Sequence, residues 1–278
     1  MPEKPNAKMK SAASPGKKIV TPPPVPEKET GTVKRVLMLL RMLADHPGES
    51  AQSLAERLNL PRSTVHRLLA TLRANEFALH ESDGSFGPGL EMYRMAGRLG
   101  ARMPYRRLAA PYLEELSARF NETAILSLLA RPQLRMFHAA TCFPPDPMRY
   151  NIELNRLEPL LWGATCRVQL AYLSEEEIAA AIAQGDVSPV KKLRPELNEL
   201  RKSLARIRAD GYAITQAHRT ANAVGVAAPF FDGENEIAGS LGFLIPQFRW
   251  NDKVAERVVA ALQDSARKLT RQLGGMPR

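Results

Sequence analysis

The chain has 278 residues, of which 44% are hydrophobic, so it is long enough for two domains and apolar enough to bury a core. Lys and Arg number 39 against 29 Asp and Glu, and the formal net charge of +10 favours an anionic partner such as a nucleic acid or a membrane surface. No apolar run approaches the length of a membrane span, and no secretory signal is recognisable. The two cysteines, Cys142 and Cys166, are too few for a disulfide framework. We therefore expect a cytoplasmic protein with reduced thiols.

Residues 1–30 are expected to form a disordered, basic, proline-rich tail. The run Pro22-Pro23-Pro24 favours extended polyproline II, and the segment has no periodic apolar face. Six Lys and three Glu give the segment a charge of +3. Such a tail can touch DNA phosphates, although more often it is a solvated leader.

Three helical patterns follow the tail. The first is an apolar stripe that stops at Pro47, formed by Val33, Val36, Leu37, Leu40, Leu43 and Ala44. The second has Ser50 as its N-cap and contains Ala51, Leu54, Ala55 and Leu58. After a break that ends at Pro61, the third runs from about Arg62 to Asn75, with Val65, Leu68, Leu69 and Leu72 on one face.

Two short β-like runs come next, around an Asp83-Gly84 turn. The first run is Phe77–Glu81 and the second begins at Phe86, so the pattern predicts a β-hairpin. Three helices and a hairpin in about 60 residues are typical of a winged helix-turn-helix, which we assign to residues 31–91.

The third helix has the features of a DNA recognition helix. Opposite its apolar face lie Ala70 and Ala74, which are small enough to let the backbone approach a groove. Ser63 and Arg67 can reach base edges, and arginine prefers guanine. A plain amphipathic surface helix is the alternative, but the neighbouring helices and hairpin favour DNA binding. The predicted DNA-binding residues are Arg62, Ser63, Thr64, His66, Arg67 and Thr71.

The charge of this module is balanced. Residues 31–91 contain seven Lys plus Arg and seven Asp plus Glu, so positive charge must be sorted onto one face or supplied from elsewhere. A linker helix, expected over residues 92–104, can supply it because Arg94, Arg98 and Arg102 recur every four residues. The stripe either contacts DNA or faces solvent.

Residues 105–278 alternate helical patterns with short β-like runs, which predicts an α/β or α+β domain. The β-like runs include Ala124–Leu129, Val224–Ala228 and Ser240–Ile245, and the last helix spans about Asp252 to Leu273. No histidine stands at metal-ligand spacing, and no nucleophile elbow or phosphate-binding loop occurs. We therefore expect no enzyme, no metal site and no cofactor.

The segment from Leu54 to Leu72 resembles the helix-turn-helix of the IclR family of bacterial regulators. The resemblance continues through Ala110–Leu116, Asn121–Thr123, Asp210–Ala213 and Ala227–Asp232, and covers about residues 31–273. It implies an α+β protein with an N-terminal winged helix-turn-helix, a linker helix and a C-terminal GAF-like effector domain over residues 105–278. It also implies a transcriptional regulator that binds double-stranded operator DNA as a homo-oligomer, dimer or tetramer, under the control of a small organic ligand.

The effector pocket implied by this resemblance is expected between the three β-like runs and a helix that begins near Gly163. Its residue types predict apolar walls, and a helix N-terminus favours a carboxylate, so an aromatic carboxylic acid is a candidate effector. The predicted effector-binding residues are Leu126, Phe137, Leu161, Trp162, Gly163, Ala164, Thr165, Cys166, Val226, Leu241 and Phe243.

The chain departs from the family pattern at this pocket. Leu161 stands where the family commonly has His, Trp162 replaces a small residue, Cys166 replaces Gly, and the segment Ile214–Arg219 replaces an acidic stretch. Trp162 either stacks on an aromatic ligand or fills the pocket. In the second case the C-terminal domain is a ligand-free oligomerisation or protein-interaction module. A membrane-surface protein is a third interpretation, which leaves the helix-turn-helix unexplained.

Overall fold

The computed structural model describes residues 31–146 and 149–278, so the tail predicted over residues 1–30 lies outside the described residues. The chain divides into two compact units, one ending at Tyr93 and the other spanning Arg94–Arg278.

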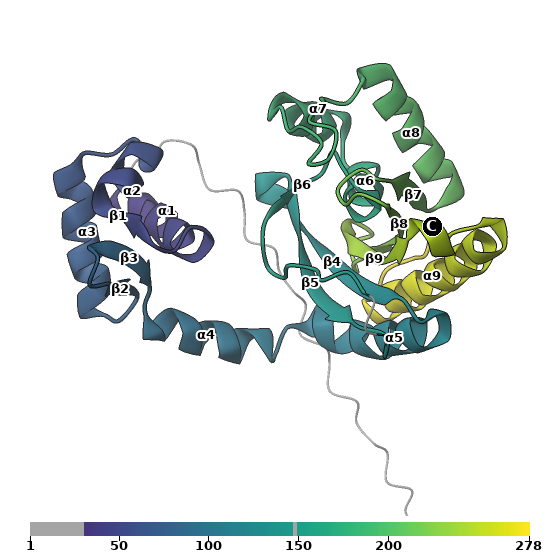
Figure 1. Ribbon diagram of the computed structural model, residues 1–278, viewed down its shortest axis with the longest axis horizontal. Helices are drawn as coiled ribbons and strands as arrows, with labels where there is room; N and C mark the ends of the chain where they lie inside the picture. Colours follow the sequence, from purple (N-terminus) through teal and green to yellow (C-terminus); the bar gives the residue numbers. More distant parts are fainter. Residues whose placement is uncertain (1–30, 147–148) are drawn as a thin grey trace, which may run out of the picture. The chain divides into compact units, whose positions relative to one another are not determined.

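The first unit contains three helices and a small antiparallel sheet (Figure 1). The helices are α1 (Thr32–Asp45), α2 (Ala51–Leu58) and α3 (Arg62–Ala74). The sheet has the order β1-β3-β2, formed by β1 (Glu49–Ser50), β3 (Ser85–Pro88) and β2 (Ala78–His80). The predicted hairpin is confirmed as the β2–β3 pair, whereas β1 has no counterpart in the sequence analysis. The unit is a winged helix-turn-helix, as expected.

Local chemistry sets the break between α2 and α3. The Ser50 hydroxyl accepts a hydrogen bond from the N–H of Ser53 (3.2 Å), so this residue caps α2 as predicted. Asn59 adopts the left-handed conformation with a φ of 50°, which ends α2 and lets the N–H of Leu60 donate to the carbonyl of Ala55 (3.0 Å). Pro61 then occupies the N-cap position of α3, where its carbonyl accepts hydrogen bonds from the N–H groups of Thr64 (2.9 Å) and Val65 (3.2 Å).

The core of this unit confirms the predicted face of α3 and only part of that of α1, from which Val36, Leu40 and Leu43 contribute to the core. Val65, Leu68, Leu69 and Leu72 are all buried. On α1 the buried residues are Leu39 and Leu43, whereas Val33 is 74% exposed and Leu37 is 52% exposed. Helix α1 carries apolar residues around most of its circumference, so its periodicity does not select one face.

The second unit is built on a six-stranded antiparallel sheet with the order β6-β5-β4-β9-β8-β7. The strands are β4 (Thr123–Ala130), β5 (Arg135–Cys142), β6 (Glu158–Pro159), β7 (Ala213–Gln216), β8 (Ala223–Phe231) and β9 (Ile237–Pro246). The helices are α5 (Pro104–Phe120), α6 (Ala164–Leu170), α7 (Glu175–Ala183), α8 (Leu197–Asp210) and α9 (Asp252–Gln272). Helix α4 (Leu90–Gly100) stands where the linker helix was predicted, but it ends four residues earlier, and α5 begins at Pro104.

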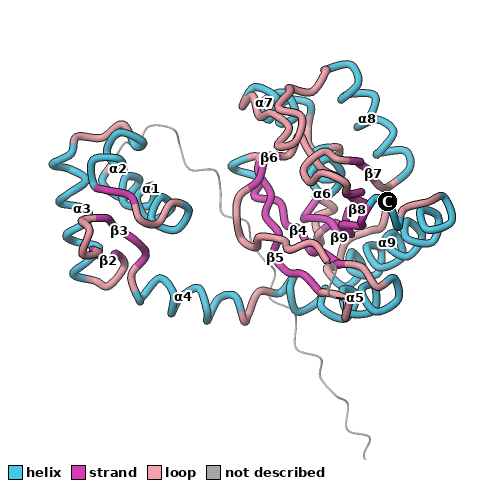
Figure 2. Tube along the Cα trace, in the orientation of Figure 1, coloured by secondary structure: helices cyan, strands magenta, loops and turns pink. Residues whose placement is uncertain are grey.

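Helices cover both faces of this sheet (Figure 2). Helices α5 and α9 pack on one face around a core that contains Leu126, Val226 and Leu241. Helix α6 lies on the other face against β8 and β9, in a second core shared with α7 and α8. Antiparallel strands, connected in part by helices that pack on both faces of the sheet, confirm the expected α+β class. Within residues 31–146 and 149–278, no helix is long and apolar enough to cross a membrane.

Candidate functional site

Helix α3 presents an open polar face. Its predicted DNA-binding residues are exposed except for Thr64, which is partly buried, and the neighbouring Ala70 and Ala74 are exposed as well. The side chain of Arg62 donates from Nε to Nε2 of His66 (3.4 Å), and the Thr71 hydroxyl donates to the carbonyl of Arg67 (3.1 Å). The buried face of α3 therefore fixes the helix to its unit and leaves the opposite face for a partner.

The guanidinium of Arg67 on α3 is not neutralised by any neighbouring carboxylate that the structure describes. Glu49 of β1 forms an ion pair with Arg57 of α2 (2.8 Å). Across the described ranges, no carboxylate forms an ion pair with Arg67. A formally neutral module thus presents an unneutralised guanidinium on its exposed helix face.

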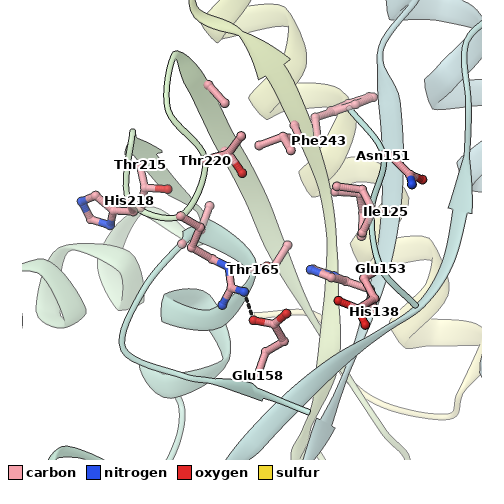
Figure 3. A pocket seen from close by; sticks show the side chains of 17 residues that line it. Ile125, His138, Asn151, Glu153, Glu158, Thr165, Thr215, His218, Thr220 and Phe243 are labelled. Carbon is pink, nitrogen blue, oxygen red and sulfur yellow. Dashed lines mark ion pairs between the residues drawn. The ribbon is translucent and has the colours of Figure 1, made fainter. Parts of the chain in front are cut away.

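A pocket of about 170 Å³ lies in the second unit, between the sheet and the beginning of α6 (Figure 3). Its walls come from the six strands of the sheet, the start of α6, residues 151–153 and the segment between β7 and β8. The lining residues are Ile125, His138, Asn151, Ile152, Glu153, Glu158, Gly163, Ala164, Thr165, Thr215, His218, Arg219, Thr220, Ala223, Gly225, Phe243 and Leu244. Nine of these seventeen residues are polar, so the pocket differs from the apolar cavity predicted from the sequence.

An ion pair between Arg219 and Glu158 lies in the wall of this pocket, drawn as a dashed line in Figure 3. The two side chains are only 22% and 14% exposed. Gly163 permits this arrangement: its φ of +93° suits glycine, and a Cβ at this position would lie 2.6 Å from Cδ of Arg219. Burial, with a smaller contribution from Arg156, lowers the pKa of Arg219 to about 10, so the guanidinium is still charged at neutral pH.

Two histidines in the pocket are neutral at physiological pH. Burial, helped by the charge of Arg219, lowers the pKa of His138 to about 4, and Nδ1 of this ring lies 2.9 Å from the Ser127 hydroxyl. Burial, followed by the charges of Arg167 and Lys191, lowers the pKa of His218 to about 4. The buried Nδ1 of His218 has no hydrogen-bond partner among the described residues. Both rings therefore offer hydrogen-bonding groups rather than charge.

The thiol of Cys166 lies close to this pocket but does not line it. Burial raises the pKa of the thiol to about 12, and Arg219 donates to its sulfur at 3.8 Å. A thiol with so high a pKa stays protonated and is a poor nucleophile. In the part of the chain that the structure describes, no group of three His, Cys, Asp or Glu side chains is arranged to hold a metal ion.

The structure brings four of the predicted effector-binding residues to this pocket and places seven elsewhere. Gly163, Ala164, Thr165 and Phe243 border the pocket, although the Phe243 ring packs against Phe120 in the core under α5. The seven residues that do not line it are Leu126, Phe137, Leu161, Trp162, Cys166, Val226 and Leu241.

Strand alternation explains these placements. On β4 the Leu126 side chain enters the core under α5 and α9, whereas Ile125 faces the pocket. On β8 Val226 lies in that core and Gly225 borders the pocket. Sequence reasoning chose the large apolar residues of each strand, and those residues fill the core.

Trp162 has neither of the positions expected for it. Its indole is 7% exposed, donates from Nε1 to the carbonyl of Asp186 (3.2 Å) and packs edge-on against His218 with 5.5 Å between ring centroids. The ring belongs to the core between α6 and α8 and does not line the pocket.

Except for Thr165, the polar lining residues were missed by the sequence analysis. His138, Glu158, His218 and Arg219 match no catalytic or metal-ligand spacing, and only the fold brings them together. One signal was available: His218 and Arg219 belong to the segment that replaces the family's acidic stretch.

Two family models match the chain. Residues 32–80 match the IclR helix-turn-helix domain, and residues 99–271 match the bacterial transcriptional regulator IclR C-terminal domain. The HTH-type transcriptional regulator Rv1719 of Mycobacterium tuberculosis is 31% identical over 234 residues, which cover 75% of this chain and 87% of that protein. The HTH-type transcriptional regulator KipR of Bacillus subtilis is 23% identical over 246 residues, covering 87% of this chain and 97% of that protein.

Solved structures show the same fold. A putative IclR transcriptional regulator from Silicibacter sp. TM1040 superposes with a TM-score of 0.80 at 23% identity, covering 89% of this chain and 98% of that chain. An IclR homologue from Microbacterium hydrocarbonoxydans, crystallised in complex with 4-hydroxybenzoate, superposes with a TM-score of 0.68 at 20% identity, covering 87% and 98%. Because the family models span both units, this chain belongs to the IclR family of bacterial transcriptional regulators and is a DNA-binding regulator rather than an enzyme.

Proposed function

We propose that this protein binds operator DNA in the cytoplasm as a homo-oligomer, and that a small organic acid in the α6 pocket controls it. The mostly buried Arg219 guanidinium, which lines the pocket beside two neutral imidazoles and forms an ion pair with Glu158, carries the ligand half of this proposal. The relative solved in complex with 4-hydroxybenzoate supports it, because that protein has the same fold.

The DNA half rests on the exposed face of α3. One recognition helix covers only a few base pairs, so a single module binds weakly. We infer that two copies related by a two-fold axis bind the half-sites of a palindrome. Light scattering in the presence and absence of DNA measures the assembly, and monomer under both conditions would exclude it.

The ligand half follows from the chemistry of the pocket. A guanidinium binds a carboxylate through two parallel N–H···O bonds. Thr165 and Thr215 supply hydroxyl groups and the two neutral imidazoles supply further donors and acceptors, while Ile125 and Leu244 supply apolar surface. This combination suits a small acid that also carries a polar group, and hydroxybenzoates meet that description.

The alternative of a ligand-free interaction module depended on Trp162 filling the pocket. Its indole lies in the neighbouring core and leaves the pocket open, so no observation favours that alternative.

The experiment combines ligand binding with DNA binding. Thermal unfolding of the full chain is measured with 4-hydroxybenzoate, benzoate and pyruvate, and with benzamide as the uncharged control. An acid present at 100 times its Kd stabilises the protein by about 2.7 kcal/mol, whereas benzamide has little effect. The same acid is then added to the protein bound to DNA from upstream of its own gene, where we expect a change in affinity. Binding of an acid without any change in DNA affinity would reject ligand control, and absence of binding by every acid would favour the interaction module.

A further inference from the structure

The Arg219–Glu158 ion pair has an unusual position for a structural salt bridge. Both side chains line the pocket, and both are mostly removed from solvent. The arginine comes from the segment between β7 and β8, whereas the glutamate belongs to the edge strand β6. The pair therefore joins two walls of the pocket.

No other group in the pocket can neutralise Arg219. His138 and His218 are uncharged, and the remaining lining carboxylate, Glu153, is 63% exposed and forms an ion pair with Arg156 (2.9 Å). A buried guanidinium without a counter-ion is strongly unfavourable. Glu158 thus supplies the negative charge that Arg219 requires when no ligand is present.

We propose that the Glu158 carboxylate occupies the position on Arg219 that the ligand's carboxylate takes when it binds. A bound organic acid then forms the ion pair with Arg219 and displaces Glu158. The inference rests on the proposed ligand-binding function and names the two residues that determine specificity in it. Arg219 selects an anionic ligand. That anion must interact with Arg219 more favourably than the Glu158 carboxylate does. A neutral analogue cannot replace Glu158, because it would leave the guanidinium unpaired.

Displacement of Glu158 would act directly on the neighbouring elements of the second unit. Strand β6 consists of Glu158 and Pro159 and pairs with Met136 and Arg135 of β5. Four residues separate β6 from the first residue of α6, and Gly163 in this connection lies against the Arg219 side chain. Exchange of the carboxylate on Arg219 therefore acts on the edge of the sheet and on the start of α6 together.

The test compares the full chain with its Glu158→Gln variant by calorimetry, with benzoate and pyruvate as acids and benzamide as the neutral probe. In the native protein the pocket is competent to bind only when the ion pair is open, so the apparent Kd equals the intrinsic Kd divided by the open fraction. We expect Glu158→Gln to bind the better acid at least about tenfold more tightly than the native protein does. We expect the variant to bind benzamide no more tightly, and the double variant Glu158→Gln/Arg219→Gln to lose the gain.

Asp186→Asn is the matched control, because Asp186 forms a similarly buried ion pair with Arg135 (2.9 Å) and does not line the pocket. An equal gain in this control would overturn the inference, since the effect would then be general electrostatics. If acids bind the native protein and bind Glu158→Gln equally or more weakly, Glu158 is not a competitor, and the proposed sensor function stands without this inference. If no acid binds any variant, both fail. If Glu158→Gln does not fold, acid binding is measured with Glu158→Asp instead. Tighter binding than in the native protein supports the inference, and equal or weaker binding overturns it.

Discussion

Arg67 lies at the centre of the exposed face of α3, and no described carboxylate forms an ion pair with it. We predict that Arg67→Ala weakens operator binding by about 1–3 kcal/mol and relaxes the base preference, because a bidentate contact to guanine would be lost. Fluorescence anisotropy with operator and with random DNA measures both quantities.

Arg73 provides the matched control. It is an exposed arginine of the same helix that lies off the face centred on Arg67. Arg73→Ala should leave base preference unchanged. Equal losses on operator and random DNA in Arg67→Ala would make Arg67 a phosphate contact.

Gly163 is the second single residue on which the pocket depends. Its positive φ and the proximity of the Arg219 side chain both oppose a Cβ. We predict that Gly163→Ala destabilises the second unit by about 1–3 kcal/mol, from backbone strain, and weakens acid binding. Both tryptophans, Trp162 and Trp250, belong to this unit, so their fluorescence during urea unfolding reports its stability.

Gly97→Ala is a suitable comparison because Gly97 lies within α4 and a Cβ there meets no atom within 4 Å. That change should stabilise the helix by about 0.5–1 kcal/mol. A Gly163→Ala protein as stable as the native chain would show that the segment before α6 adjusts without strain.

Among the elements, α4 and the residues just after it carry three regularly spaced arginines. Arg94 and Arg98 are exposed on this helix, and Arg102 is exposed just after its end. If these residues face DNA, the triple alanine variant should weaken binding to all sequences alike. The slope of log K against log salt should then flatten by about one unit per lost contact in each subunit.

The control for this element is the triple alanine variant of Arg201, Lys202 and Arg206, which are exposed on α8. It removes the same amount of charge from another surface and should leave the slope unchanged. An unchanged slope in the α4 variant would assign its arginines to solvent or to a subunit interface.

At the scale of the whole molecule, the buried histidines make stability depend on pH. The pKa of His138 is about 4 in the folded protein, against an ordinary value of 6.5. Between these values the unfolded chain binds more protons than the folded chain, so stability falls as pH decreases from 6.5 towards 4. We predict a slope of up to about 1.4 kcal/mol per pH unit from His138, and a further contribution of the same sign from His218.

Urea unfolding followed by tryptophan fluorescence across this pH range measures the slope. His138→Gln should reduce it, whereas His80→Gln in the first unit should not. Titration of the labelled histidine side chains by NMR gives a direct measurement, and an ordinary pKa for His138 would contradict the burial seen here.

The sequence by itself determined the elements whose causes are local. Ser50, Asn59 and Pro61 set the ends of α2 and α3, the Asp83-Gly84 turn set the hairpin, and four spaced apolar residues set the buried face of α3. Features that depend on non-local contacts, such as the buried face of α1 and the pairing of β1 with β3, were decided only by the tertiary structure.

The pocket is also a feature that only the tertiary structure decided. Its strands are buried on both faces, so apolar character does not distinguish Ile125 from Leu126. His138, Glu158 and Arg219 are far apart in the sequence, and they acquire their shared chemistry only because the sheet places their segments side by side.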